Sequence, residues 1–468
     1  MLFNSYIYIL LFIPVTIAVY FLLNRKPGRE YGKLFLIAAS FVFILFSGLG
    51  AAAVLAADVA VNYHLNSLIR RKKSKKILSL GVIFNILLLA AFKYSGAFEP
   101  LRAMGIALPV GLSFYTFQQI AFLVDNYRGE IPDYSLTDYT LFSVFFPKLV
   151  QGPIPYHSEL LPQFASKEKK HFSADNFSRG LMLFSIGLGK KVLLADNFGK
   201  IVDYGFSSTG SLNSFEAVLT VLAYTLQIYL DFSGYCDMAA GSAKMLNIDL
   251  PVNFDSPYKA LNISDFWKRW HITLTRFLTK YIYIPLGGNR KGAVRTYVNI
   301  IIVFLVSGLW HGVGLTFIIW GLLHGVASAL YRLIKKGYDK IPGMIRWLVT
   351  FCFVNITWVF FRAPDLSSAE ALLRRIFTGG WRFEINAELT ETLLMPTLIN
   401  VPSQIIPFVY VITALTVGTV VCCALCKNSN EIVKNFKPNF KTLIIAYLLL
   451  TFGILSLSGV GAFLYTNF

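Results

Sequence analysis

The chain has 468 residues, of which 55% are hydrophobic and only 15% are charged. A soluble protein of this length would carry far more charge on its surface, so this composition excludes an ordinary soluble domain. Several apolar runs approach the roughly 20 residues that a helix needs to cross a bilayer. No stretch repeats the alternation of barrel strands, which argues against a transmembrane β-barrel. We therefore predict an all-α polytopic membrane protein.

The net charge of +18 could indicate a nucleic-acid partner, but the positions of the cations argue against one. The cations gather in short segments between apolar runs, as the positive-inside bias of membrane proteins requires. Residues 70–76 (RRKKSKK) and 167–171 (KEKKH) are examples, with similar segments after residue 24 and near Arg332 and Lys437. We expect these cations to face a lipid bilayer and no nucleic acid.

The cysteines indicate neither disulfides nor a metal site. Cys422, Cys423 and Cys426 fall in one predicted span, while Cys236 and Cys352 stand alone. No spacing matches a zinc site, so we predict no metal and interpret the cluster as helix packing. The first 23 residues lack a basic leader and a cleavage site, which favours a retained first span over a removed signal peptide.

The first half of the chain alternates apolar runs with cation clusters. This alternation places the N-terminus outside the cytoplasm. The predicted spans are residues 6–23, 34–46, 51–68, 77–92 and 109–124.

Residues 142–155 (FSVFFPKLVQGPIP) are apolar but contain three prolines, a glycine and Lys148. A straight helix cannot contain this sequence. Broken backbone at membrane depth is tolerated where protein or a water-filled cavity supports it. We predict either a re-entrant or kinked segment that lines a cavity, or a surface loop between short helices.

The second half contains further spans and two buried acids. Asp231 and Asp237 lie in or near apolar sequence, where each could cap a helix or pair with a lysine. The polar residues 363–404 form a predicted extracytoplasmic loop that could dock a partner. We expect one transmembrane domain, residues 1–468, with about 10–12 crossings; the later spans are residues 215–230, 298–334 (two short spans), 348–361, 405–425 and 443–457.

The residues from Ser264 to His311 carry the strongest signs of chemistry. Ser264 and Asp265 are a cap and an acid that open a predicted helix, which would place Trp267 and His271 on one face. A turn at PLGGNRKG follows, and an apolar run then ends on His311. An ionisable residue at membrane depth marks a functional site by default, so His311 is the leading candidate.

Other readings of the histidines remain open at this point. His324, in GLLHG, echoes His311 in GLWHG, and the glycines at both places are also signals of close helix packing. His271 follows Trp267, Lys268 and Arg269. This pattern is typical of an interfacial helix, or of a site in which Lys268 or Arg269 holds an anionic donor.

Six sequence blocks resemble the membrane-bound O-acyltransferases (MBOAT), and within them the bacterial alginate O-acetyltransferase type. They cover most of residues 105–335, which we take as the catalytic core. A sister branch that transfers D-alanine to teichoic acids lacks the YIPLGGNR continuation present here at residues 283–290. The blocks are LPVGLSFYTFQQIAFLVDNYRG (108–129), FFPKLVQGPI (145–154), GKKVLLAD (189–196), YLDFSGYCDMAAGSAKMLNIDLPVNFDSPY (229–258), DFWKRWHITLTRFLTKYIYIPLGGNR (265–290) and SGLWHG (307–312).

The resemblance implies a ring of tilted helices around a thinned centre, plus re-entrant or interfacial helices. It places the catalytic histidine on His311 and the second histidine on His271, and leaves His324 a packing or secondary position. Lys268, Arg269 and Arg290 would hold the phosphates of the donor. The residues expected to line the site are Trp267, Trp310, Asp231 and Asn253.

The resemblance also implies the reaction. An acetyl group would pass from acetyl-CoA, or from a carrier thioester, to a hydroxyl, with His311 as the base and no bound cofactor. His271 would orient the base or stabilise the developing oxyanion. A hydrolase-like extracytoplasmic partner would pass the acetyl group to an exopolysaccharide, as in alginate biosynthesis, or to a cell-wall glycan. The location would be the bacterial cytoplasmic membrane.

Two alternatives remain. The first is D-alanyl transfer to teichoic acid by the sister branch. The second is a transporter without bond chemistry, since intramembrane histidines and glycine hinges fit that class too.

Overall fold

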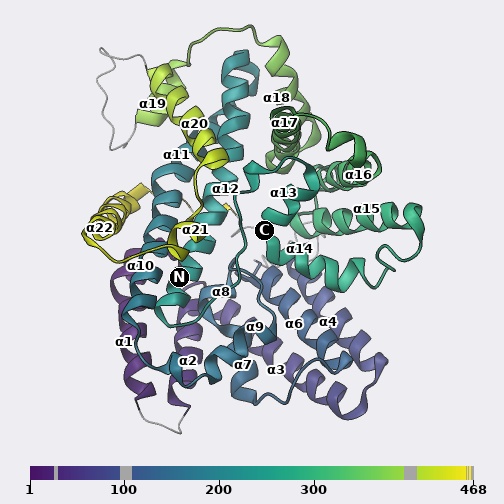
Figure 1. The fold of residues 1–468 in the computed structure, drawn as a ribbon, viewed down its shortest axis with the longest axis vertical. Coiled ribbons are helices and arrows are strands. Elements are labelled where there is room, and N and C mark those ends of the chain that lie inside the picture. The colour runs from purple at the N-terminus through teal and green to yellow at the C-terminus, as the bar shows by residue number, and fades with distance from the viewer. Residues whose placement is uncertain (26–29, 95–107, 395–407, 460, 462, 465–468) are drawn as a thin grey trace.

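A computed structural model describes residues 1–25, 30–94, 108–394, 408–459, 461 and 463–464. Within these ranges the regular structure is entirely helical (Figure 1). Seven of the described helices are long and apolar enough to cross a membrane, and three shorter apolar helices accompany them. The prediction of an all-α polytopic membrane protein is therefore confirmed.

The helices of the N-terminal part lie together at the lower end of Figure 1. Their order follows the predicted spans closely, and large apolar side chains such as Leu80 and Leu87 remain exposed on them, as lipid-facing residues would. The elements are η1 (Tyr8–Phe12), α1 (Ile13–Asn24), α2 (Tyr31–Leu45), α3 (Leu49–Lys72), α4 (Lys75–Lys93), α6 (Leu112–Arg128) and α7 (Leu136–Val144).

Residues 142–155 form a broken segment inside the protein. α7 ends at Val144, α8 spans only Phe146–Leu149, and no helix follows until α9 (His157–Ala165). Residues 141–155 are all buried, so the kink is confirmed and the surface-loop alternative is wrong. That the segment lines a cavity stays a prediction. The buried Lys148 ammonium donates to the Ser143 carbonyl at 3.1 Å and to the Gln118 side chain.

α12 (Ser214–Met245) runs through the middle of the molecule (Figure 1). The predicted span of residues 215–230 was too short, because the helix continues through both buried acids. Asp231 pairs with Lys191 at 2.7 Å and Asp237 pairs with Lys190 at 2.7 Å. These ion pairs compensate the cost of burying the carboxylates, so the acidic positions need not end the helix.

The lysines of these pairs come from a helix that packs along α12. This helix consists of α10 (Ala174–Gly189), the π-helical turn η4 (Lys190–Ala195) and α11 (Asp196–Ser207). Three short 3₁₀ helices in the middle part of the chain are η3 (Glu168–Lys170), η5 (Thr209–Ser211) and η6 (Pro257–Lys259).

α15 (Gly292–His311) and α16 (Leu315–Tyr338) form an antiparallel hairpin with a break at residues 312–314, in place of the two short spans predicted within residues 298–334. Glycines let the two backbones approach closely. A Cβ added to Gly308 would lie 2.4 Å from the Phe317 carbonyl oxygen, and one added to Gly321 would lie 2.5 Å from that of Phe304. The packing role of these glycines is therefore confirmed.

The remaining elements complete the chain. The predicted loop of residues 363–404 contains two helices, α18 and α19, and residues 395–404 of it lie outside the described residues. The bounds are α13 (Ile263–Arg269), α14 (Ile272–Leu278), η7 (Thr279–Tyr283), α17 (Gly343–Arg362), α18 (Leu366–Thr378), α19 (Ala387–Leu394), α20 (Phe408–Leu425), α21 (Ser429–Lys434), α22 (Phe440–Leu455) and η8 (Ser456–Gly459).

The hairpin yields a stability prediction. Gly308→Ala should destabilise the protein by about 1–3 kcal/mol, because the added methyl overpacks the α15–α16 contact. Gly418→Ala is the matched control, since a Cβ at this helical glycine meets nothing within 4 Å. Thermal unfolding in detergent measures both. Equal melting of the two variants would contradict the close packing of the hairpin.

Candidate active site

The helix expected to carry both Trp267 and His271 is interrupted, so the prediction that they share one helical face is wrong. α13 ends at Arg269, and His271 adopts a left-handed backbone conformation with φ of 45° at the start of α14. The N-cap is also earlier than predicted. Asn262, rather than Ser264, caps α13 by accepting a hydrogen bond from the Asp265 backbone N–H at 2.8 Å.

The unusual backbone at His271 is held by Asn253. The Oδ1 atom of Asn253 accepts hydrogen bonds from the Thr273 backbone N–H (3.1 Å) and from the Thr273 hydroxyl (2.9 Å). It also lies 3.2 Å from Nδ1 of His271. A carbonyl oxygen only accepts, so the hydrogen of a neutral His271 must be on Nδ1.

This tautomer leaves the other ring nitrogen of His271 as an acceptor. Nε2 is buried and has no hydrogen-bond partner among the described residues. The imidazole is only 1% exposed and packs against Phe232 at 4.9 Å and Phe114 at 6.3 Å. The site thus contains a buried, oriented lone pair whose neighbours are aromatic rings.

Other parts of the chain are joined at the same place. The Thr273 hydroxyl accepts from the Ile154 backbone N–H at 3.0 Å, which connects α14 to the broken segment of residues 142–155. The Asn253 amide nitrogen donates to Cys236 on α12 at 3.3 Å. Asn253, predicted to line the site, is therefore the centre of the hydrogen bonds that shape it.

His311 lies at the last position of α15 and is 3% exposed. Its ring contacts Trp320 at 5.2 Å and Phe361 at 4.9 Å. The indole of Trp310 lies 4.6 Å from the His311 ring and 6.4 Å from the His271 ring, measured between centroids. The structure therefore brings together the two predicted histidines, with Trp310 in contact with both.

Lys93 and Tyr94, which our sequence analysis did not select, fix this end of α15. The Lys93 ammonium donates to the Trp310 carbonyl, and the Tyr94 hydroxyl donates to the Leu309 carbonyl at 2.7 Å. These groups satisfy the free carbonyls of the helix C-terminus, where a cation is favoured. The sequence signal was a lysine directly after the apolar run of residues 77–92.

His324 occupies a different environment. Its Nδ1 accepts a hydrogen bond from the Trp267 indole N–H at 3.2 Å, and its ring packs against Trp320 and Phe353. His324 and His311 both contact Trp320, because the hairpin reverses the chain between them. Trp267 therefore supports His324 and does not share a face with His271.

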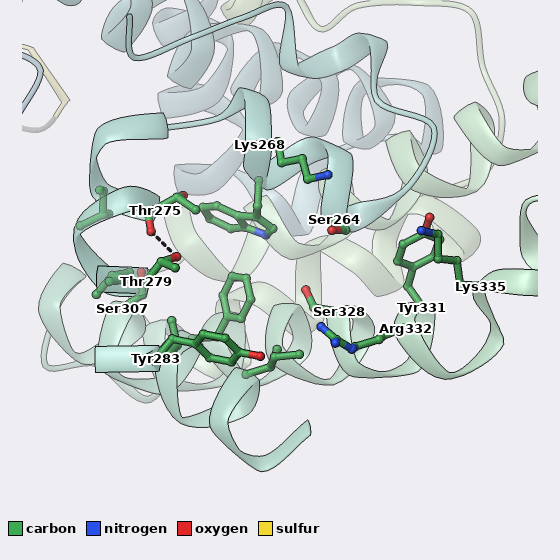
Figure 2. A pocket seen from close by; sticks show the side chains of 16 residues that line it. Ser264, Lys268, Thr275, Thr279, Tyr283, Ser307, Ser328, Tyr331, Arg332 and Lys335 are labelled. Carbon is green, nitrogen blue, oxygen red and sulfur yellow. Dashed lines mark hydrogen bonds between the residues drawn. The ribbon is translucent and has the colours of Figure 1, made fainter. Parts of the chain in front are cut away.

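A cavity of about 630 Å³ lies among α13, α14, α15 and α16, and neither His271 nor His311 is on its lining. Its lining includes Trp267 and Ser307. Ser307 lies one helical turn before His311 on α15. Figure 2 shows Lys268 and Arg332 on different walls of this cavity, with Lys335 at one side. The cavity combines a largely apolar lining with cations, an arrangement suited to a ligand with an anionic end.

The other predicted cations lie elsewhere. Arg269 pairs with Asp265 at 3.0 Å and with Asp255 at 3.9 Å, so its charge is already compensated. Arg290 is exposed and is not among the residues that line the cavity. Asp231 lies next to Phe232, but its carboxylate is held by Lys191 and by the Leu464 backbone N–H at 3.0 Å.

Ion pairs connect the cavity to one of the basic segments. Lys280, three residues before the cavity residue Tyr283, pairs with Glu130 at 2.8 Å. The hydrogen bond from Lys280 lowers the pKa of Glu130, so this pair persists at neutral pH. Close by in sequence, Asp133 pairs with Arg70 of the 70–76 cluster. These ion pairs link η7, which ends at Tyr283, and the 70–76 cluster to the same short segment, residues 130–133.

Buried histidines around one indole, in a protein with seven described helices long and apolar enough to cross a membrane, fit an enzyme that works within membrane helices. A family model described as MBOAT, membrane-bound O-acyltransferase family, matches residues 33–368. The chain therefore belongs to the membrane-bound O-acyltransferase family, and it is an O-acyltransferase.

Three relatives illustrate the range of the family. The chain is 39% identical to a peptidoglycan O-acetyltransferase of Helicobacter pylori, over 100% of this chain and 98% of the relative. It is 35% identical to a "Probable alginate O-acetylase" of Pseudomonas aeruginosa, over 85% of this chain and 79% of the relative. Identity falls to 23% with a teichoic acid D-alanyltransferase of Streptococcus thermophilus, over 47% of this chain and 56% of the relative.

The hydrogen bonds of Asn253 predict the tautomer of His271. Nitrogen NMR of protein labelled with ¹⁵N-histidine should show His271 as neutral with its proton on Nδ1 at pH 7, assigned by comparison with His271→Gln. In Asn253→Leu this tautomer preference should weaken, since the acceptor is gone. A wild-type spectrum with the proton on Nε2 would contradict the geometry.

Proposed function

We propose that the protein transfers an acetyl group from a thioester donor to a hydroxyl, for O-acetylation of a cell-wall glycan or exopolysaccharide. The observation that carries the proposal is the pair His271 and His311 around Trp310. The cavity with cations is lined by Ser307, one helical turn before His311. The names of the relatives with 35–39% identity support acetyl as the transferred group.

His311 is the general base in this proposal. It accepts the proton of the acceptor hydroxyl as the oxygen attacks the thioester carbonyl, and then gives that proton to the departing thiolate. His271 presents Nε2, an acceptor, to the same space. It can orient the hydroxyl or the His311 ring, but in its neutral form it has no second N–H for an oxyanion.

The cavity is the proposed donor site. Lys268, Arg332 and Lys335 would bind the phosphates of acetyl-CoA, and the apolar lining would take the pantetheine arm toward Ser307. None of these three cations forms an ion pair with a carboxylate in the described part of the chain, so their charges are available. This assignment keeps Lys268 from the sequence prediction and replaces Arg269 and Arg290, which lie outside the cavity.

Peptidoglycan is the favoured polymer over alginate. The peptidoglycan relative matches over its whole length with the higher identity, whereas the alginate relatives leave part of this chain unmatched. D-alanyl transfer is less well supported, because those relatives match only about half of the chain at 23–24% identity. Membership of an acyltransferase family also argues against a transporter.

The acetyl group has to reach a polymer outside the cytoplasmic membrane. The apolar helices and the basic segments support a location in that membrane with the donor cavity toward the cytoplasm. A hydrolase-like extracytoplasmic partner would take the acetyl group to the glycan. Purified protein that acetylates soluble peptidoglycan fragments alone, at the full rate, would exclude such a relay.

Replacing the base tests the proposal most simply. His311→Ala should lower the rate of CoA release from acetyl-CoA by about 10³-fold, because proton transfer loses its base. His324→Gln should stay within about threefold of wild type, since glutamine keeps an acceptor for the Trp267 N–H. Equal turnover by wild type and His311→Ala, with unchanged melting, would overturn the assignment.

The donor site predicts a change in KM. Arg332→Ala should raise the KM for acetyl-CoA about tenfold, because one charged hydrogen bond to phosphate is lost. Lys336→Ala, four residues along α16 and outside the lining, is the control. With acetyl-pantetheine, which has no nucleotide phosphates, Arg332→Ala and wild type should behave alike. A KM for acetyl-CoA that does not change would exclude Arg332 from donor binding.

A further inference from the structure

Acyl transfer from a thioester places negative charge on the acyl oxygen, and a buried site has to supply a hydrogen-bond donor for it. His271 is the obvious candidate for this hydrogen-bond donor, but its tautomer excludes it. Its only N–H points to Asn253, and Nε2 is an acceptor. A protonated His271 would have a charge among the rings of Phe114, Phe232 and Trp310, which is costly.

The indole of Trp310 has the required properties. Its side chain is 6% exposed, and Nε1 has no hydrogen-bond partner among the described residues. A buried donor without a partner is uncommon, because it costs free energy in the unliganded protein. Such a donor next to two histidines indicates a group that is satisfied only when the reacting molecule is present.

The Trp310 ring is also held firmly. It stacks on Phe117 at 5.1 Å and meets Phe114 edge-on at 5.6 Å, while its backbone carbonyl is bound by Lys93. A donor fixed in this way needs little reorganisation as charge develops, which is the condition for effective electrostatic stabilisation.

The neighbouring tryptophans fit the role less well. The N–H of Trp267 is already bound to His324. Trp320 has a partnerless N–H and touches His311, but its other recorded ring contacts are with Trp267, His324, Trp358 and Phe361. Trp310 is the indole recorded in ring contact with both His271 and His311.

We propose that Trp310 is a catalytic residue whose indole N–H stabilises the acyl oxyanion. This proposal rests on the acetyl transfer proposed above. The hydroxyl oxygen forms a bond to the thioester carbon while His311 takes the hydroxyl proton, and the carbonyl oxygen becomes negative. The C–S bond then breaks, the thiolate receives that proton from His311, and ester and thiol leave. Trp310 donates a hydrogen bond throughout and exchanges no proton.

The test replaces the N–H of Trp310 without changing the shape of its ring. Full-length protein in detergent receives 3-(3-benzothienyl)alanine at position 310, which keeps the bicyclic ring and has sulfur in place of N–H. We expect kcat for CoA release from acetyl-CoA to fall by about 10²-fold, as for loss of an oxyanion donor. KM should stay within about twofold and the melting temperature should not change. Trp310→Phe should show the same fall in kcat.

The same replacement at positions 320 and 358 provides the comparison. At position 358, whose indole packs against Trp320 and His324, turnover should be unchanged. The proposal is overturned if the protein altered at 310 keeps the kcat of wild type, if only its KM changes, or if position 320 shows the loss instead. If wild-type protein shows no turnover, the proposed function itself is contradicted. This outcome differs from an unchanged kcat in the protein altered at 310, which contradicts only the role of Trp310.

Discussion

The site depends on one carbonyl oxygen, Oδ1 of Asn253. It binds the backbone and the hydroxyl of Thr273 and the Nδ1–H of His271, and so supports the left-handed backbone that separates α13 from α14. Since a non-glycine residue in this conformation is strained, the surrounding hydrogen bonds have to over-determine it. In return, His271 leaves the helical face and its Nε2 stays free in a buried space. Asn253 thus sets both the position and the chemical character of the second histidine.

Buried ionisable groups elsewhere in the protein include several that are paired. Asp231 and Asp237 have lysine partners, and Lys148 has two oxygen partners. By contrast, indole or imidazole nitrogens without a described partner occur in His271, Trp310, Trp320 and His324. In a low-dielectric interior such groups are costly, and the proposed reaction uses two of them, Nε2 of His271 and Nε1 of Trp310.

The family resemblance of the sequence pointed to His311 and His271, whose roles stay predictions. From its residues alone, the sequence predicted the helical class, most span positions and the kink at residues 142–155. These features follow from hydropathy, from proline and from the cost of buried charge, which are local properties. It failed where a distant residue decides. Asn253 breaks the helix at His271, Trp267 turns to His324, and Lys93 reaches the end of α15 from α4. Arg332 and Lys335 were seen only as part of a basic segment, because their meeting with Lys268 depends on tertiary structure.

The most direct test is a structure of the full-length enzyme with an acetyl-CoA analogue in which a methylene group replaces the thioester sulfur. The account predicts the phosphates near Lys268, Arg332 and Lys335, and the analogue's carbonyl between His271 and His311, with its oxygen toward the Trp310 N–H. An analogue bound with its phosphates outside this cavity, or with its carbonyl away from both histidines, would contradict the account.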